Sequence, residues 1–326
     1  MLPTPDLHDP WPVVARQGSQ VQIIVIGAGG TGSQLVPNLA RLVWDFNQQH
    51  DEHAAGAKRR ASLLIVDHDI VAEKNVRARQ NFCPPEIGYP KAQVLANRYA
   101  IAFGMRKDEI GALVKPFTSE VLQKHYSDLV ILVGCVDTAE ARVAIAECLK
   151  SNSPASVPRI WYVDAGNGFH WGQVFVGNTA TIADLRGCLH DPICARLPSP
   201  ALLAPSMFEA PPEEEAASTT MKLSCGDLVL TTQEGNRQSR TINTHMAALV
   251  YTYVEQLIYG TITTFATYTN LPTFETHSVP VTPEALGRVL DQQPEFFTMH
   301  PDDEDEDEDE DEEGGDGEDE DEHELE

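Results

Sequence analysis

The chain lacks several features that would mark whole classes of protein. None of its apolar runs approaches the ~20 residues that a transmembrane helix needs, so we expect no transmembrane helix and no membrane partner. The N-terminus, MLPTPDLHDPW, has neither a basic start nor an apolar core, so no secretory signal peptide is expected. We therefore expect a cytoplasmic protein.

Cysteine is sparse, and no Cys-x-x-Cys pair occurs. The six cysteines are scattered through the 326 residues without the spacing of a disulfide framework, which favours a reducing compartment. A structural Cys₄ zinc site needs two paired motifs. Cys188 and Cys194 flank His190, but no second pair follows, and we expect no zinc.

Lysine and arginine are absent from residues 302–326, which contain 20 acidic residues. This block supplies −20 of the net charge of −27 and leaves −7 for the rest of the chain. Such a block cannot bury enough apolar surface to fold, so residues 301–326 are predicted to be a disordered acidic tail. The tail either solvates the protein or docks a basic partner, and it would repel nucleic acid as a direct partner.

Residues 21–35, VQIIVIGAGGTGSQL, are the most informative stretch. Val21 to Ile26 predicts a buried parallel strand, and Ser33 opens a helical pattern that runs to about Phe46. The loop between them contains Gly27, Gly29, Gly30 and Gly32. A strand, a glycine turn and a helix N-terminus together present backbone N–H groups to a phosphate, so this stretch predicts a nucleotide site.

Strand and helix patterns alternate after this point. The expected strands are 62–66, 114–117, 129–133, 159–163 and 172–176, and the expected helices are 91–102 and 139–149. Residues 47–60 lack apolar periodicity and are interpreted as a surface insertion, and Asp164 to Gly168 as a turn. The alternation predicts an α/β fold with a Rossmann-like doubly wound parallel sheet.

The second half of the chain has a different organisation. We expect an arm at 1–20, a nucleotide-binding adenylation domain at 21–178, a crossover loop at 179–224, a C-terminal part of the same domain at 225–300, and then the tail. Within the C-terminal part the patterns predict a helix at 242–258, a β-hairpin at 261–281 and a short helix at 284–290.

Further motifs follow the glycine loop. These are D-x-D-x-V-x-x-x-N from Asp67, then R-Q, then G-x-P-K ending at Lys91, then V-D-x-x-x-x-R around Asp137. The combination resembles the ThiF/MoeB/HesA family of ATP-dependent enzymes that activate ubiquitin-like proteins. The resemblance covers roughly residues 18–180 and extends more loosely to about 260.

The resemblance implies attack of a C-terminal carboxylate on the α-phosphorus of ATP, giving an acyl-adenylate and pyrophosphate. Oriented donors and cations must hold the charge that develops. The implied catalytic residues are Arg79, Lys91, Asp137 and a cysteine, with Asp137 as the Mg²⁺ ligand. The implied ATP-binding set is Gly27, Gly29, Gly30, Gly32, Ser33, Asp67, Asp69, Asn75, Arg79, Gln80, Lys91 and Asp137.

One arginine stays open between two positions. The family has N-x-x-R-Q, whereas Arg79 and Gln80 come one residue late here and Arg77 stands beside them. Either arginine can fill the phosphate-binding role.

Many relatives pass the acyl group to a cysteine, whose thiolate is a good acceptor at neutral pH. Cys225, in L-S-C-G-D after the crossover loop, occupies the family's acceptor position. Cys188 and Cys194 are rival acceptors. Cys83, Cys135 and Cys148 lie in or beside regular elements and are expected in the core.

The resemblance also suggests partners. The stretch from Gln238 to Asn243, Q-x-x-x-x-N, and the later V-P-V-T-P are similar to the bacterial subgroup named PRTRC-system ThiF proteins. A small ubiquitin-like β-grasp protein ending in glycine is the expected substrate, a conjugating enzyme is a further candidate partner, and a homodimer is expected.

Three alternative functions explain these motifs less completely. A nicotinamide-dependent oxidoreductase explains the glycine loop and Asp67, but leaves Asn75, Lys91 and Asp137 without a role. A non-catalytic scaffold of the same fold would have lost its nucleotide-binding residues. A sulfur-carrier adenylyltransferase is disfavoured by the missing Cys-x-x-Cys pairs.

Overall fold

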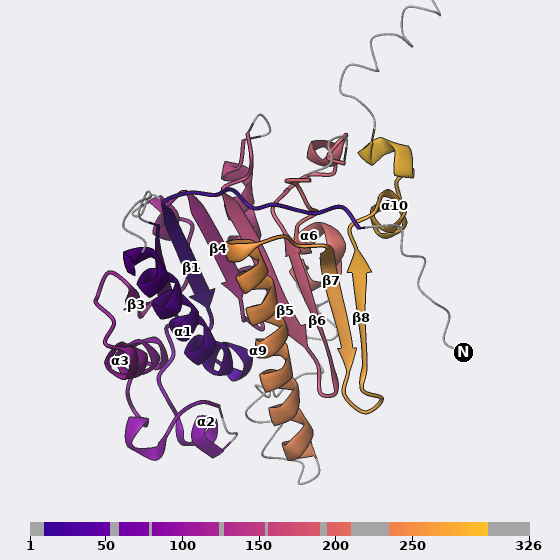
Figure 1. The fold of residues 1–326 in the computed structure, drawn as a ribbon. Helices are drawn as coiled ribbons and strands as arrows, with labels where there is room; N and C mark the ends of the chain where they lie inside the picture. The colour runs from indigo at the N-terminus through magenta and orange to yellow at the C-terminus, as the bar shows by residue number, and fades with distance from the viewer. Residues whose placement is uncertain are drawn as a thin grey trace, which may run out of the picture.

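The computed structural model describes residues 10–52, 59–77, 80–123, 127–153, 156–189, 194–209 and 235–298. Arg79, Cys225 and the acidic tail at 301–326 lie outside these ranges, so the hypotheses about them stay predictions. Within the described ranges the chain forms one mixed sheet of eight strands, covered by helices on both faces (Figure 1). The predicted α/β Rossmann-like fold is confirmed.

The first half of the chain supplies five parallel strands and the helices that connect them. In chain order these elements are β1 (Gln20–Ile26), α1 (Gly30–Glu52), β2 (Arg60–Val66), α2 (Glu73–Arg77), α3 (Lys91–Phe103), β3 (Ile110–Leu113), α4 (Glu120–Gln123), β4 (Leu129–Gly134), α5 (Ala139–Ala146) and β5 (Ile160–Asn167). Two short 3₁₀ helices, η1 (Pro84–Glu86) and η2 (Glu147–Ser151), lie among them.

The second half adds three antiparallel strands to the same sheet. Its elements are β6 (Trp171–Gly177), η3 (Ala183–Leu185), α6 (Pro200–Leu203), η4 (Pro205–Phe208), α9 (Gly235–Tyr259), β7 (Thr264–Asn270), β8 (Glu275–Pro280), α10 (Pro283–Leu290) and η5 (Pro294–Phe297). The strand order is β3-β2-β1-β4-β5-β6-β7-β8. The predicted hairpin is β7–β8, and the predicted helix at 242–258 lies within α9.

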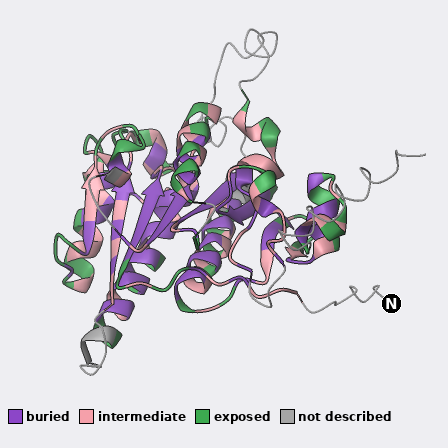
Figure 2. Ribbon diagram, turned by 90° about the horizontal axis from the view of Figure 1, so that it is seen from above, coloured by how far each residue is buried: buried purple, intermediate pink, exposed green. Residues whose placement is uncertain are grey.

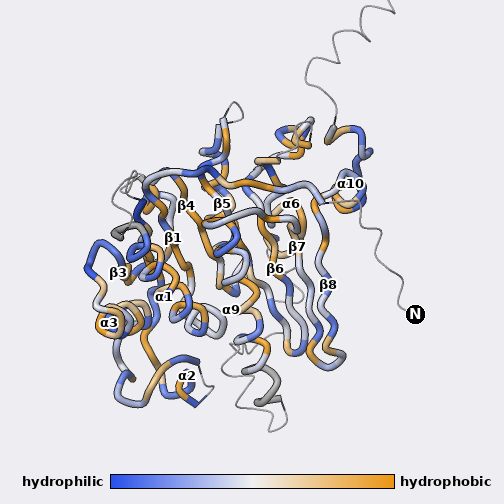
Figure 3. Tube along the Cα trace, viewed as in Figure 1, coloured by the Kyte–Doolittle hydropathy of each residue, from blue (hydrophilic) through white to orange (hydrophobic). Residues whose placement is uncertain are grey.

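Alternate residues of the central strands face two separate cores. In β1, Ile23 and Val25 face the core shared with α1 and α9, whereas Ile24 and Ile26 face the core shared with α5. All four are at most 3% exposed, which explains why the strand has no polar alternation. Figure 2 shows the buried strands between partly exposed helices, and Figure 3 shows hydrophobic residues concentrated along the central strands.

Three sequence predictions differ from the structure. β3 lies at 110–113 rather than 114–117, and Val114 is 45% exposed. β5 continues through Asn167 where a turn was expected, because Gly166 and Asn167 pair with the antiparallel strand β6. As part of this second difference, the antiparallel pairing makes the sheet mixed, where a parallel sheet was predicted.

The third difference is the end of α1, which continues to Glu52 into the stretch interpreted as a surface insertion. Asn47 is 1% exposed there. Its side chain accepts the N–H of Ala61 at 2.8 Å and donates to the carbonyl of Ala61 at 3.0 Å, which ties the helix to β2. Apolar periodicity did not predict this part of the helix, because the buried residue is polar and is held by hydrogen bonds.

The N-terminal arm crosses the amino ends of the parallel strands (Figure 1). Trp11 donates its N–H to Val281 O at 2.8 Å, and Val13 and Ile262 exchange backbone hydrogen bonds. Val14 donates to Cys194 O at 3.0 Å. The arm therefore joins the described part of the crossover loop to the hairpin. No helix among the described residues is long and apolar enough to cross a bilayer.

Candidate functional site

One cavity of about 670 Å³ opens at the carboxyl ends of β1, β2 and β4. β1 stands between β2 and β4, so the order of the strands reverses at β1. Ligands of open α/β sheets bind at the carboxyl ends of the strands where the order reverses in this way. The predicted site residues that line the cavity are Gly27, Gly29, Gly30, Asp67, Asp69, Asn75, Gln80, Lys91 and Asp137.

The glycine loop leads from β1 into α1. Gly27 has a φ of +93° and lies so close to Cys135 that an added Cβ would be 2.4 Å from the carbonyl oxygen. A Cβ on Gly29, by contrast, would meet nothing within 4 Å. Gly29 therefore exposes bare backbone to the cavity at the start of α1, where the helix dipole favours an anion.

Asp67 fixes this loop to the segment after β2. Its Oδ2 accepts the N–H of Ala28 at 2.6 Å, and its Oδ1 accepts the N–H of Asp69 at 2.7 Å. Both carboxylate oxygens are thus engaged by backbone donors. Asp67 shapes the cavity wall, and Asp69 is the carboxylate that stands further into solvent.

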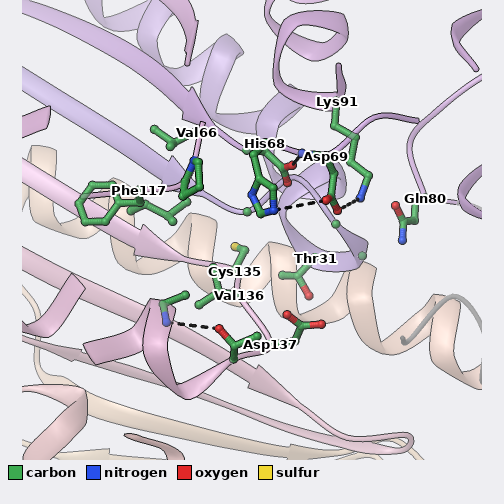
Figure 4. A pocket seen from close by; sticks show the side chains of 18 of the residues that line it. Thr31, Val66, His68, Asp69, Gln80, Lys91, Phe117, Cys135, Val136 and Asp137 are labelled. Atoms are coloured by element: carbon green, nitrogen blue, oxygen red, sulfur yellow. Dashed lines mark hydrogen bonds and ion pairs between the residues drawn. The ribbon is translucent and has the colours of Figure 1, made fainter. Parts of the chain in front are cut away.

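Asp69 forms an ion pair with Lys91, whose Nζ lies 2.8 Å from Oδ2 (Figure 4). The Lys91 side chain is only 7% exposed, whereas that of Asp69 is 54% exposed. Partial burial alone would raise the pKa of Asp69, but the hydrogen bond and charge of Lys91 outweigh it and lower that pKa. Lys91 is therefore a nearly buried ammonium at the edge of the cavity.

Two amides continue the same wall. Asn75 Oδ1 accepts the N–H of Ala72 at 2.7 Å, so the amide NH₂ is the group that Asn75 can offer to an anion. Gln80 donates its N–H to Asn75 O at 3.0 Å. The buried Oε1 of Gln80 has no hydrogen-bond partner among the described residues, and an orphaned acceptor beside a cavity fits a donor on a ligand.

The opposite wall follows β4 and carries Cys135, Val136 and Asp137 (Figure 4). Asp137 is exposed toward the cavity. Arg142, which is 8% exposed, donates through Nη2 to Val136 O at 2.8 Å and holds the backbone next to Asp137. Its Nε lies 3.3 Å from Oδ2 of the fully buried Asp164.

The buried carboxyl of Asp164 has a second partner. Tyr162 donates its hydroxyl to Oδ1 at 2.6 Å. Burial raises the pKa of Asp164 although Arg142 opposes that rise, and burial also raises the pKa of Tyr162. This cluster lies behind the cavity wall and serves to hold the Asp137 segment in place.

Some cavity residues were not foreseen. Val66 and Phe117 form an apolar end, and Lys74 and Lys115 add two further cations to the lining. Asn167 at the end of β5 and Asn243 on α9 complete the lining. Only Asn243 had a sequence signal, as the last residue of Q-x-x-x-x-N.

Other predicted site residues lie outside the cavity. Gly32 packs on the loop, since an added Cβ would be 1.9 Å from Gly27 O. Ser33 is buried, and its hydroxyl accepts the N–H of Asn81 at 3.0 Å. Arg77 pairs with Glu73 at 2.5 Å, and its rival Arg79 is outside the described residues.

The described cysteines divide by location. Cys194 is fully buried and donates its N–H to Pro12 O at 3.1 Å, at the end of the sheet opposite the glycine loop. A hydrogen bond between the two thiols raises the pKa of Cys188 and lowers the pKa of Cys194. Neither rival acceptor is near the cavity.

The other three were expected in the core. Burial places Cys148 there and raises the pKa of its thiol to about 11. The prediction is wrong for Cys83, which is exposed. Cys135 lines the cavity, and burial raises the pKa of its thiol to about 12, so it carries no thiolate at neutral pH.

The lining chemistry has three parts. Val66 and Phe117 offer apolar contacts suited to a nucleobase, and Asp69 nearby offers carboxylate oxygens suited to sugar hydroxyls. Lys91, Asn75 and the backbone at Gly29 offer donors suited to phosphates. Asp137 faces them from the other wall and offers the hard oxygen ligand that Mg²⁺ prefers.

Known proteins resemble this chain over most of its described length. The model of the ThiF family matches residues 14–285. The NEDD8-activating enzyme E1 catalytic subunit of Saccharomyces cerevisiae is 30% identical over 150 residues, which is 44% of this chain and 43% of that protein. The chain thus spans less than half of that relative.

Solved structures that this chain matches include E. coli MccB with AMPCPP and MccA, at 13% identity and a TM-score of 0.45. E. coli MccB with ATP gives 14% identity and a TM-score of 0.46. In both cases the match covers 80% of this chain and 63% of the MccB chain.

Proposed function

Because this chain belongs to the ThiF family, we propose that it adenylates the C-terminal carboxylate of a small ubiquitin-like β-grasp protein with ATP. One observation carries the proposal: the glycine loop, the Asp69–Lys91 pair and Asp137 line a single cavity of about 670 Å³. The apolar end of that cavity suits adenine, and its nearly buried ammonium suits a phosphate chain.

In the proposed step a carboxylate oxygen attacks the α-phosphorus of ATP. A carboxyl–phosphate bond forms, the bond from the α-phosphorus to the bridging oxygen breaks, and pyrophosphate leaves. The nucleophile is already an anion, so no general base is needed. Lys91, the Asn75 amide and the N–H groups of the glycine loop stabilise the charge on the phosphate oxygens.

Asp137 would hold Mg²⁺, which neutralises phosphate charge when bound. Its exposed carboxylate faces the cavity. Within the described residues, Asp137 forms no ion pair with a lysine or an arginine. The donor set therefore fits the ion. Arg142 would keep the Asp137 segment at a fixed distance from the opposite wall.

We further propose transfer of the acyl group to Cys225. The thiolate attacks the acyl carbon, AMP leaves, and the thiol proton passes to solvent. Chain length supports this: Cys225 is ten residues before Gly235, the first residue of α9, and ten residues span at most ~35 Å. α9 itself carries Asn243 into the cavity.

The finer assignments belong to the same proposal. They are a homodimer, membership of the PRTRC-system subgroup, a conjugating enzyme as a second partner, and the domain boundaries given above. The similarity to the NEDD8-activating enzyme E1 catalytic subunit of Saccharomyces cerevisiae supports a ubiquitin-like substrate.

ATP–pyrophosphate exchange with Mg²⁺ and a ubiquitin-like protein encoded nearby tests both steps. We expect exchange by the wild type and by Cys225→Ala, and a thiol-labile adduct on non-reducing gels for the wild type alone. An adduct that persists in Cys225→Ala would make another cysteine the acceptor.

Direct ATP binding separates the enzyme from its alternative. A folded protein that fails to bind Mg·ATP in calorimetry would be a scaffold that retains the fold without the chemistry. Binding without exchange would instead indicate the wrong protein substrate, and a sulfur-carrier protein is then the next one to assay.

A further inference from the structure

Two asparagines at the β5 side of the cavity form a pair. Asn167 Nδ2 donates to Asn243 Oδ1 at 3.0 Å, and Thr31 Oγ1 donates to the same oxygen at 3.4 Å. The three residues come from β5, α9 and α1, so the pair joins the glycine loop to the antiparallel half of the sheet. The pair has no part in the nucleotide contacts described above.

The asparagine pair is held firmly in place. A Cβ added to Gly30 would lie 2.5 Å from Asn243 Nδ2 and 3.0 Å from Oδ1, so the amide rests directly on the glycine loop. Oδ1 of Asn243 and Nδ2 of Asn167 are engaged with each other. Within the described residues, Nδ2 of Asn243 and Oδ1 of Asn167 have no hydrogen-bond partner, and both residues line the cavity.

One free donor and one free acceptor on these paired side chains match the backbone of one residue in an extended chain, because the N–H and the carbonyl of the same residue point to the same side of a strand. The surroundings support this choice, because Thr31 and the two asparagines are all uncharged. A phosphate would need cations, and the nearly buried Lys91 is paired with Asp69 on the wall beyond β2.

We propose that Asn243 and Asn167 bind the backbone of the penultimate residue of the acyl substrate, which enters as an extended chain from the β5–β6 side. Asn243 Nδ2 donates to the carbonyl of that residue, and Asn167 Oδ1 accepts its N–H. The inference rests on the proposed adenylation and adds the residues that would select a peptide C-terminus over other carboxylates.

Two stable ligands test it by calorimetry. The octanoyl and N-acetyldiglycyl conjugates of 5′-O-sulfamoyladenosine both contain the same anionic acyl sulfamate, which cannot transfer, and acyl chains of equal length, but only the second has backbone N–H and carbonyl groups along its chain. We expect the wild type to bind the N-acetyldiglycyl conjugate about tenfold more tightly or better, as two hydrogen bonds with ordered partners allow.

The decisive variant is Asn243→Asp. It keeps the oxygen that accepts from Asn167 and Thr31, and it replaces the Nδ2 donor by an oxygen. The tenfold preference for the N-acetyldiglycyl conjugate over the octanoyl conjugate should disappear, because repulsion between the new carboxylate and the anionic acyl sulfamate affects both ligands equally. Asn167→Ala should cause the same selective loss, and Asn97→Asp on the exposed face of α3 is the matched control.

Three results would overturn the inference. A preference for the N-acetyldiglycyl conjugate that persists in Asn243→Asp would mean that Asn243 only shapes the glycine loop. Equal wild-type affinity for both ligands would mean that no peptide group is bound. A folded wild type that binds neither ligand would remove the proposed function, and the inference with it.

Discussion

Each wall of the cavity has an ion pair between a basic residue and an aspartate, one in the wall and one behind it, and the two aspartates differ in their exposure to water. On the β2 side, Lys91 lies 2.8 Å from Asp69, whose side chain is 54% exposed. On the β4 side, Arg142 lies 3.3 Å from Asp164, whose side chain is 0% exposed. The first pair has a carboxylate that water can solvate, and the second has one that water cannot reach.

This difference separates a pair that a ligand can rearrange from a pair that only supports. An incoming phosphate can share the Lys91 ammonium, because Asp69 keeps its hydration when the lysine turns away. Asp164 has no such alternative, since the loss of Arg142 would leave a carboxyl among apolar side chains. Four substitutions follow from this contrast, and the one with the largest effect comes first.

Arg142→Met should destabilise the fold by about 3–5 kcal/mol, since it leaves Asp164 buried with Tyr162 as its remaining partner. Urea unfolding followed by circular dichroism measures this. Asp164→Asn in the Arg142→Met background should recover part of the loss. A loss below about 1 kcal/mol would show that the buried pair contributes little.

The same variant should show a distinct pH dependence. The pKa of Asp164 is already raised by burial, and removing Arg142 raises it further. Between the unfolded-state pKa of 3.8 and the higher folded-state pKa, the native state then binds more protons than the unfolded state. The stability of Arg142→Met should therefore fall, relative to the wild type, as pH rises above about 4.

Lys91→Met should act on chemistry rather than on the fold. We expect pyrophosphate exchange to fall by about 10²–10³-fold, the range for losing one charge-stabilising donor, with unfolding free energy changed by less than about 1 kcal/mol. Lys107→Met, at an exposed turn, is the control. A large loss of stability would place Lys91 with the supporting pair instead.

Gly29→Ala and Gly32→Ala should separate a position that contacts the ligand from one that supports the fold, within the same glycine loop. The added methyl meets no protein atom within 4 Å, so stability should not fall. It stands where a phosphate approaches the backbone, and ATP affinity should drop by about tenfold or more. Gly32→Ala is the counterpart, because its Cβ would lie 1.9 Å from Gly27 O and should disrupt the fold. Unchanged ATP affinity in Gly29→Ala would move the phosphates elsewhere.

Asp128→Asn should have the smallest effect. Asp128 Oδ2 accepts the N–H groups of Ser19 and Gln20 at 2.7 and 3.0 Å at the amino end of β1, and its pKa is lowered by these bonds, that of Gln20 first. This contribution is present above the unfolded-state pKa of 3.8 and is lost as pH falls through the lower folded-state pKa. The variant should lose under about 1 kcal/mol at pH 7 and less at pH 3. An equal loss at both pH values would contradict this.

The sequence predicted one wall of the cavity better than the other. The glycine loop, Asp67, Asp69 and Lys91 follow local patterns in which strand, turn and helix are adjacent in the chain. Asp164 was placed in a turn, because a run of Asp, Ala, Gly and Asn lacks strand propensity. Its strand is stabilised by pairing with β6, which no local pattern reports.

The asparagine pair illustrates what local patterns omit altogether. Thr31 and Asn243 are 212 residues apart, and Asn167 and Asn243 are 76 apart. Spacing within a motif predicts which side chains share a helix face or a turn. It carries no distance between segments that meet only when the sheet and α9 are assembled.

The packing of α9 on the glycine loop also limits when the asparagine pair can form during synthesis. Contacts that span 212 residues form late, because the chain between them must first be ordered. A nascent chain that ends before residue 243 has the glycine loop and Lys91 but no β7, β8 or Asn243. Its nucleotide cavity lacks one side, so full substrate recognition would begin only after synthesis has passed residue 243.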